Sequence, residues 1–178
     1  MLRFFLLFLL IQAVLFVGEL TPFGQRWVVE PWTGLVAAAS ATLVTMFDPD
    51  VVSYGKILQH TKNHFAVSIE AGCNGIEASI VLLAAILAFP STWKHKFYGL
   101  LAGFAAIHVL NLVRVISLFY IGQWNMDVFE WAHLYLWQAL IMLDALIVFL
   151  IWLRLLPKEP EQTQTPSAGD STPESAQA

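Results

Sequence analysis

The sequence predicts an all-α membrane protein: a polytopic bundle of about five transmembrane helices, with a short outer loop that holds a small β-hairpin. Two observations support this. The 178 residues are 58% hydrophobic and only 12% charged, whereas soluble domains are about half apolar and about a quarter charged. In addition, five apolar stretches approach the roughly 20 residues that a helix needs to cross a bilayer.

The five stretches make up an integral membrane domain over residues 1–156 and lie at residues 4–18, 28–47, 71–89, 97–121 and 134–156. The second stretch is interrupted by Glu30 and Pro31, and the third reaches full length only by including Cys73 and Glu77. Residues 157–178 are rich in Pro, Glu, Gln, Ser and Thr. Such a composition cannot bury enough apolar surface to order itself, which predicts a disordered polar cytoplasmic tail.

The loop over residues 48–70 is polar but contains two runs with high β propensity. These runs, at residues 51–54 and 65–69, flank Lys62 and Asn63. Two such runs around polar residues are typical of a hairpin.

Orientation follows from the lysines and arginines of the short loops, which favour the cytoplasmic side. Lys94 and Lys96 lie in the loop at residues 90–96, and Arg154 and Lys158 follow the last stretch, whereas the loop at residues 122–132 has neither residue type. The loop at residues 122–132 is therefore expected outside. Two predicted spans separate it from residues 48–70, so these are expected on the same side. Five spans would also put Arg3 outside, where a basic residue is unfavourable.

Arg114 is the first candidate for a functional residue. It lies about 12 Å below the outer end of its apolar stretch at the helical rise per residue, and an unpaired arginine at the centre of a membrane helix costs about 2.5 kcal/mol or more. Glu77 and Asp144 are the buried acids within its expected reach. An ion pair from Arg114 to one of them is the structural explanation, and a catalytic or binding role is the functional one.

Cys73 is the only cysteine, which excludes an intramolecular disulfide. Single cysteines are often inert, but Cys73 has a glycine nearby on each side and shares the expected outer face with Arg114 and His133. A helix N-terminus and a nearby cation would favour its thiolate. The three groups suit acyl transfer, with Cys73 as nucleophile, His133 as general acid and base, and Arg114 stabilising the oxyanion.

Other polar residues have weaker assignments. Asn111, three residues before Arg114, could orient the arginine, bind substrate backbone or hydrogen-bond between helices. His60 and His64 have the spacing of a metal pair, but their segment is not clearly helical, so neither a metal nor a cofactor is expected. The absence of a basic patch argues against nucleic-acid binding.

Three motifs together resemble the exosortase and archaeosortase family. They are Ala71-Gly72-Cys73-Asn74-Gly75-Ile76-Glu77, Asn111-Leu112-Val113-Arg114-Val115-Ile116 and Phe129-Glu130-Trp131-Ala132-His133. Their order is that of the family, they fall within residues 65–152, and the wording around Cys73 is most similar to the exosortase H branch.

This resemblance implies a cysteine protease and transpeptidase of the bacterial inner membrane, with its active site facing the periplasm. Its substrates would be exported proteins that end in a short motif, a transmembrane helix and a basic cluster. The resemblance carries over the nucleophile to Cys73, the arginine to Arg114 and the histidine to His133. Exosortases of full length have more spans than the five predicted here.

Two other functions fit parts of the sequence. A small transporter or proton-relay protein would use Arg114, Asp144, Glu77 and His108 as an intramembrane polar path. A structural partner in an envelope complex would need none of these residues for chemistry. No inverted repeat, the usual sign of a transporter, is visible in the sequence.

Overall fold

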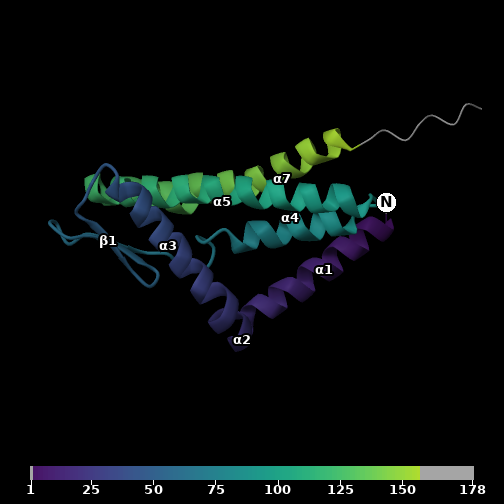
Figure 1. Cartoon of the computed structure of the whole chain (residues 1–178), viewed down its shortest axis with the longest axis horizontal. Helices are drawn as coiled ribbons and strands as arrows, with labels where there is room; N and C mark the ends of the chain where they lie inside the picture. The colour runs from purple at the N-terminus through teal and green to yellow at the C-terminus, as the bar shows by residue number, and fades with distance from the viewer. Residues whose placement is uncertain (1, 157–178) are drawn as a thin grey trace, which may run out of the picture.

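The computed structural model describes residues 2–156, so the predicted tail at residues 157–178 lies outside the described residues. Long helices dominate and run roughly along one axis of the molecule, with a small sheet at one end (Figure 1). The elements are α1 (Leu2–Leu20), α2 (Pro22–Gly24), a π-helical turn η1 (Gln25–Val29), α3 (Glu30–Thr45), β1 (Val51–Tyr54), β2 (Ile57–His60), β3 (Ala66–Ser68), α4 (Ile76–Ala88), α5 (Trp93–Trp124), α6 (Met126–Trp131), a second π-helical turn η2 (Ala132–Leu136) and α7 (Trp137–Leu155).

Helices α4, α5 and α7 form the centre of the bundle. Their contact is a cluster of buried apolar side chains that includes Leu82, Ile86 and Ile107. Gly99 and Gly103 on α5 allow the close approach, because a Cβ at either position would come within 2.4 Å of Trp152 or Leu82 side-chain atoms. Small residues at such crossings are the usual means of packing helices in membranes.

The sheet has the order β1-β2-β3, with both pairs antiparallel. A second apolar cluster, which includes Val44, Val51, Leu58 and Phe119, packs it against α3 and α5. The predicted strands at residues 51–54 and 65–69 exist, but they do not pair with each other. Both pair with β2, which follows β1 through a two-residue turn at Gly55, where φ is 55°.

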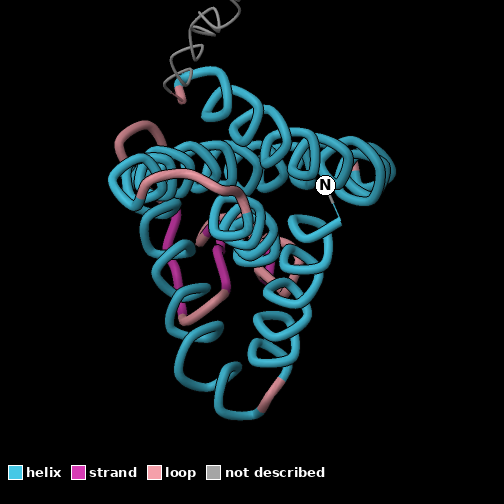
Figure 2. The backbone as a smooth tube through the Cα atoms, turned by 90° about the vertical axis from the view of Figure 1, so that its right-hand side faces the viewer, coloured by secondary structure: helices cyan, strands magenta, loops and turns pink. Residues whose placement is uncertain are grey.

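Helices α1 and α3 form a V whose apex is α2 (Figures 1 and 2). A Cβ at Gly24 would lie 2.1 Å from the carbonyl oxygen of Gly18, so the sharp reversal at the apex requires glycine. The Phe4 ring contacts Phe89 at the end of α4, with 6.0 Å between centroids. The chain therefore begins at the end opposite the sheet, together with the end of α7, and the parity argument that placed Arg3 beside the sheet is wrong.

The predicted helical membrane bundle with a small sheet is confirmed. Within residues 2–156, four continuous helices are long and apolar enough to cross a membrane: Leu2–Leu20, Pro22–Thr45, Trp93–Trp124 and Met126–Leu155. Helix α4 has only 13 residues, which at 1.5 Å per residue is about 20 Å, less than the roughly 30 Å hydrocarbon core. The predicted span at residues 71–89 is thus a short helix preceded by a loop.

Candidate active site

Cys73 lies in the loop between β3 and α4, not on a helix. Gly72 and Gly75 on either side have φ values of 83° and 80°, in the left-handed region that glycine adopts without strain. These two residues prevent α4 from beginning before Ile76. The Cys73 backbone N–H donates to the Glu70 carbonyl at 2.9 Å, so it is not free to act as a hydrogen-bond donor to a substrate.

Asn74 fixes this loop to α3. It is fully buried, its amide donates to the Thr33 hydroxyl at 3.1 Å, and its side-chain oxygen accepts from the Ile76 N–H at 3.0 Å. Its backbone carbonyl accepts from the Trp32 indole at 3.3 Å. Sequence reasoning missed this role, although an Asn that precedes a helix start is a known signal for such a turn.

Glu77 has a different partner from the one predicted. Its carboxylate accepts a hydrogen bond from the Gly72 N–H and so stabilises the loop that carries Cys73. The prediction had placed Cys73 and Glu77 in one membrane-spanning helix, with Glu77 in reach of Arg114. It was wrong because Cys73 precedes the helix and the chain folds back over the Glu77 side chain.

Arg114 comes from the middle of α5 and is 1% exposed. Its Nη1 donates to the Gly72 carbonyl at 3.0 Å and its Nη2 to the Cys73 Sγ at 3.5 Å. Within residues 2–156 it forms no ion pair with a carboxylate. The ion pair to Glu77 or Asp144, which was the structural explanation for Arg114, is therefore absent from the described residues, and the Cys73 loop takes Nη1 and Nη2 instead.

His133 reaches the same thiol from the third side. It lies in η2, and both of its ring nitrogens are 3.9 Å from the Cys73 Sγ. Its ring stacks on Phe129, with an interplanar angle of 4° and centroids 5.7 Å apart. A π-helical turn inserts one extra residue into a helix and is frequent at functional sites. The structure thus brings Cys73, Arg114 and His133 together from a loop and two spans.

The three side chains line one cavity of about 320 Å³. The remaining walls come from β3 and its neighbours, from α5 and from α6, namely Phe65, Ala66, Val67, Ser68, Ile69, Val115, Leu118, Met126 and Phe129. Burial raises the pKa of the Cys73 thiol, and the nearby Arg114 charge only partly opposes this. The expectation that the free thiolate is favoured is therefore wrong, since removal from water outweighs the cation.

Two predicted supporting residues do not contact the thiol. Asn111 is fully buried next to Gly75, and its amide has no hydrogen-bond partner in the described part of the chain. Neither an arginine-orienting role nor a hydrogen bond between helices is present. Asp144 lines a separate cavity of about 240 Å³ with Leu110 and Trp137, so it belongs to the contact between α5 and α7.

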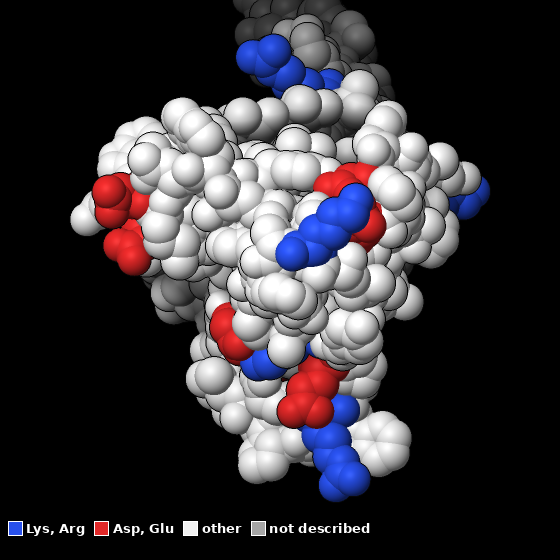
Figure 3. Space-filling view, turned by 90° about the vertical axis from the view of Figure 1, so that its left-hand side faces the viewer, with Lys and Arg blue, Asp and Glu red and all other residues white. Residues whose placement is uncertain are grey.

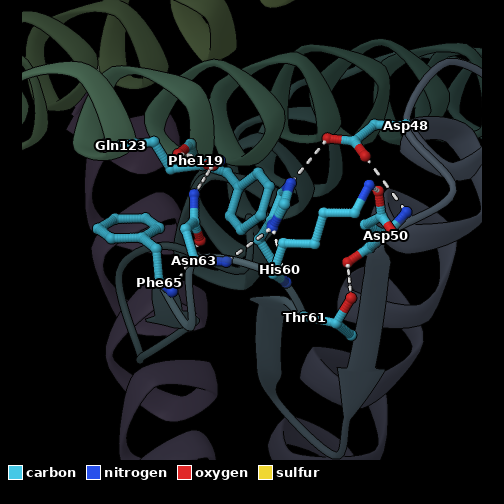
Figure 4. Close-up of polar contacts among 9 residues, drawn as sticks. Asp48, Asp50, His60, Thr61, Asn63, Phe65, Phe119 and Gln123 are labelled. Atoms are coloured by element: carbon cyan, nitrogen blue, oxygen red, sulfur yellow. Dashed lines mark hydrogen bonds and ion pairs between the residues drawn. The ribbon is translucent and has the colours of Figure 1, made fainter.

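His60 and His64, which have the spacing of a metal pair in the sequence, lie in different surroundings. His60 lies beside Asp48 and Asp50, within the spacing of metal ligands, and His64 is not part of this group. Side chains of the same loop and hairpin already contact these carboxylates (Figure 4): the His60 Nε2 is 3.3 Å from Asp48, and the Lys62 ammonium is 2.5 Å from Asp50.

The fold and the site define a polytopic helical membrane protein with a cysteine-centred site at one end of its bundle. The model of the transmembrane exosortase family (Exosortase_EpsH) matches residues 3–154. The chain belongs to this family, which confirms the resemblance drawn from the three motifs. No curated protein and no solved structure gives a significant match.

Proposed function

We propose that the protein is a cysteine protease and transpeptidase that cleaves C-terminal sorting signals of exported proteins. The observation that carries this proposal is the arrangement around one sulfur: a guanidinium nitrogen at 3.5 Å and an imidazole at 3.9 Å, both facing the cavity. Membership in the exosortase family supports the same activity.

The first chemical step forms a bond from the Cys73 sulfur to the scissile carbonyl carbon. Because burial keeps Cys73 protonated in the resting site, a general base has to take the thiol proton, and His133 is positioned for this. The carbonyl oxygen becomes an oxyanion that Arg114 stabilises. The nucleophile's own N–H, a donor in many acyl-transfer sites, is already bonded to Glu70.

The second step breaks the carbon–nitrogen bond. His133 passes its proton to the leaving amine, which departs with the substrate's membrane helix, and an acyl-enzyme thioester remains on Cys73. Water then releases an acid, or an amine acceptor forms a new amide. Both outcomes restore the thiol and balance the proton.

The orientation that fits this role has the sheet and Cys73 on the periplasmic side of the bacterial inner membrane. Lys94 and Lys96 lie in the first turn of α5 and Arg154 in the last turn of α7, all at the end opposite the sheet. This distribution agrees with the positive-inside rule. At the sheet end, Figure 3 shows small groups of charged atoms, some with both signs in contact, divided from one another by uncharged surface. Two lysines there pair with acids, Lys56 with Glu70 and Lys62 with Asp50.

The transporter alternative finds little support in the contacts. The four side chains that it requires have separate partners: Arg114 binds the Cys73 loop, Glu77 binds Gly72 and His108 lies 3.2 Å from the Ser79 hydroxyl. Asp144 has a carboxylate oxygen without a partner among the described residues. No hydrogen bond or ion pair within residues 2–156 links any two of these four side chains.

The test is co-expression with a reporter protein that ends in a sorting motif, an apolar helix and a basic cluster. The wild type should release the shortened reporter, and Cys73→Ala should insert normally and leave the reporter uncut. Normal cutting by Cys73→Ala would refute the proposal. The variant also lacks any cysteine, so a membrane-impermeant thiol reagent applied to intact cells reports the face of Cys73 in the wild type against a matched blank.

A further inference from the structure

Strand β3 is an edge strand whose outer side faces the cavity. In an antiparallel pair, every second residue exchanges hydrogen bonds with the partner strand. The His60 N–H donates to the Phe65 carbonyl, and the Ile69 N–H donates to the Lys56 carbonyl. Residues 65, 67 and 69 therefore face β2, and the backbone N–H and C=O of Ala66 and Ser68 point away from the sheet.

The same strand forms one wall of the catalytic cavity. Residues 65–69 line it opposite Met126 and Phe129, with Cys73, Arg114 and His133 in the same cavity. The side chains of Phe65, Val67 and Ile69 are partly or fully buried against the core, whereas Ala66 and Ser68 are exposed. A small and a short side chain leave the backbone of this edge accessible.

A peptide bond that Cys73 attacks has to be in an extended segment, because a helix hides its carbonyl groups in internal hydrogen bonds. Once the substrate chain leaves its membrane helix, its backbone N–H and C=O groups lose those partners near an apolar environment. Unpaired backbone groups there carry a free-energy cost. An exposed strand edge supplies replacement partners, which is how many peptides bind by strand addition.

The geometry points to β3 as the docking strand: the extended substrate segment that holds the scissile bond pairs with the free edge at Ala66 and Ser68 and becomes a fourth strand beside Cys73. This inference rests on the proposed peptidase function and names how its substrate is held. We assign the substrate segment, and not another chain, to this edge because β3 and the Cys73 sulfur line the same cavity, so a strand paired with β3 lies next to the sulfur.

The first test compares proline at the two edges of the sheet. Ala66→Pro removes an outward N–H beside the cavity, while Ser53→Pro removes the equivalent N–H at the β1 edge. The Thr61 N–H donates to the Asp50 carbonyl, so residues 50, 52 and 54 face β2 and the backbone N–H of Ser53 points away from it. Ser53 does not line the cavity. We expect reporter cleavage to fall about five-fold or more for Ala66→Pro and to stay near the wild-type level for Ser53→Pro.

Labelling of Cys73 by a small thiol reagent separates docking from folding. Unchanged labelling together with lost cleavage in Ala66→Pro supports the inference. Wild-type cleavage by a well-inserted Ala66→Pro variant would overturn it while leaving the peptidase proposal intact. If the wild type itself fails to cut any sorting signal, the peptidase proposal falls instead.

A second test leaves the enzyme unchanged, so it holds even if Ala66→Pro does not accumulate. Proline is placed at each position around the cut bond of the reporter. Pairing with β3 predicts that cleavage is lost at alternate positions, where the substrate N–H faces the strand, and tolerated between them. If proline reduced cleavage at consecutive positions, and not at every second one, the result would contradict strand pairing.

Discussion

Two clusters of reactive side chains lie at the same end of the molecule and are built in opposite ways. In the group formed by Asp48, Asp50, His60 and Lys62, each carboxylate has a partner from the same loop and hairpin: His60 for Asp48 and Lys62 for Asp50. In the group formed by Cys73, Arg114 and His133, the residues come from three distant segments, and the arginine has no carboxylate partner within the described chain.

The difference shows that stability alone explains the first cluster but not the second. Exposed or partly exposed ion pairs contribute little, about 0 to 1 kcal/mol, and they close the local structure. A buried cation without a counter-ion is unfavourable by several kcal/mol, and Arg114 is 1% exposed. Its position beside a thiol and a cavity therefore fits the proposed acyl transfer, which creates negative charge.

The largest effect is expected when Arg114 is replaced by lysine. An ammonium group keeps the charge but cannot reproduce the planar fork that reaches both Gly72 and Cys73. Reporter cleavage should fall by about 10²- to 10³-fold, the usual loss for an oxyanion donor. Arg154→Lys, the same change at the far end of α7, is the control and should cleave normally. Equal cleavage by the two variants would remove Arg114 from the mechanism.

The charge of Arg114 should also be visible in the reactivity of Cys73. Alkylation requires the thiolate, so its rate rises with pH through the thiol pKa. Burial raises that pKa and Arg114 lowers it, so Arg114→Gln should move the rate profile to higher pH and slow alkylation several-fold at a fixed pH near neutrality. A shift to lower pH would show that the guanidinium does not act on the sulfur.

A smaller effect is expected from Asn74→Ala, which leaves the catalytic groups in place but releases their loop from α3. The buried Thr33 hydroxyl and the Ile76 N–H lose a partner, at a cost of about 1 to 3 kcal/mol. Thermal unfolding in detergent should show this loss, and cleavage should decrease in parallel. A stable variant without cleavage would instead assign Asn74 a direct role in catalysis.

The smallest effect is expected from Asp48→Asn in the self-paired cluster. Its side chain can still accept from the Asp50 N–H, which is 3.2 Å from the Asp48 Oδ1, and only the charge facing His60 is lost. Stability should change by less than about 1 kcal/mol, with cleavage unchanged. Strong loss of cleavage, or restoration of it by added divalent metal, would show that this cluster takes part in function.

The sequence predicted that Cys73, Arg114 and His133 lie together, but it did not predict their contacts. Cys73, Arg114 and His133 were expected on one face because loop charges and span lengths determine which helix ends lie together. The partner of Arg114 could not be predicted in the same way. It depends on the left-handed conformations at Gly72 and Gly75, which turn a backbone carbonyl toward the guanidinium, and single-residue backbone geometry leaves no periodic pattern.

The errors in the fold have similar causes. Parity counting failed because α1 and α3 meet at a sharp apex near Gly24, which places the start of α1 beside Phe89. Strand β2 was missed because its four residues carry no alternation strong enough to separate them from the loop. The glycine turn before β2, at Gly55, was the available signal.

The π-helical turn that carries His133 lies within one long helix, Met126–Leu155, and rotates the side chains before the turn relative to those after it. Its defining bond runs from the Trp137 N–H to the Ala132 carbonyl, one residue further than in an α-helix. Removing a single residue there would restore regular winding and rotate His133 by about 100° relative to α7. The orientation of the His133 ring towards Cys73 thus depends on this one extra residue in the helix.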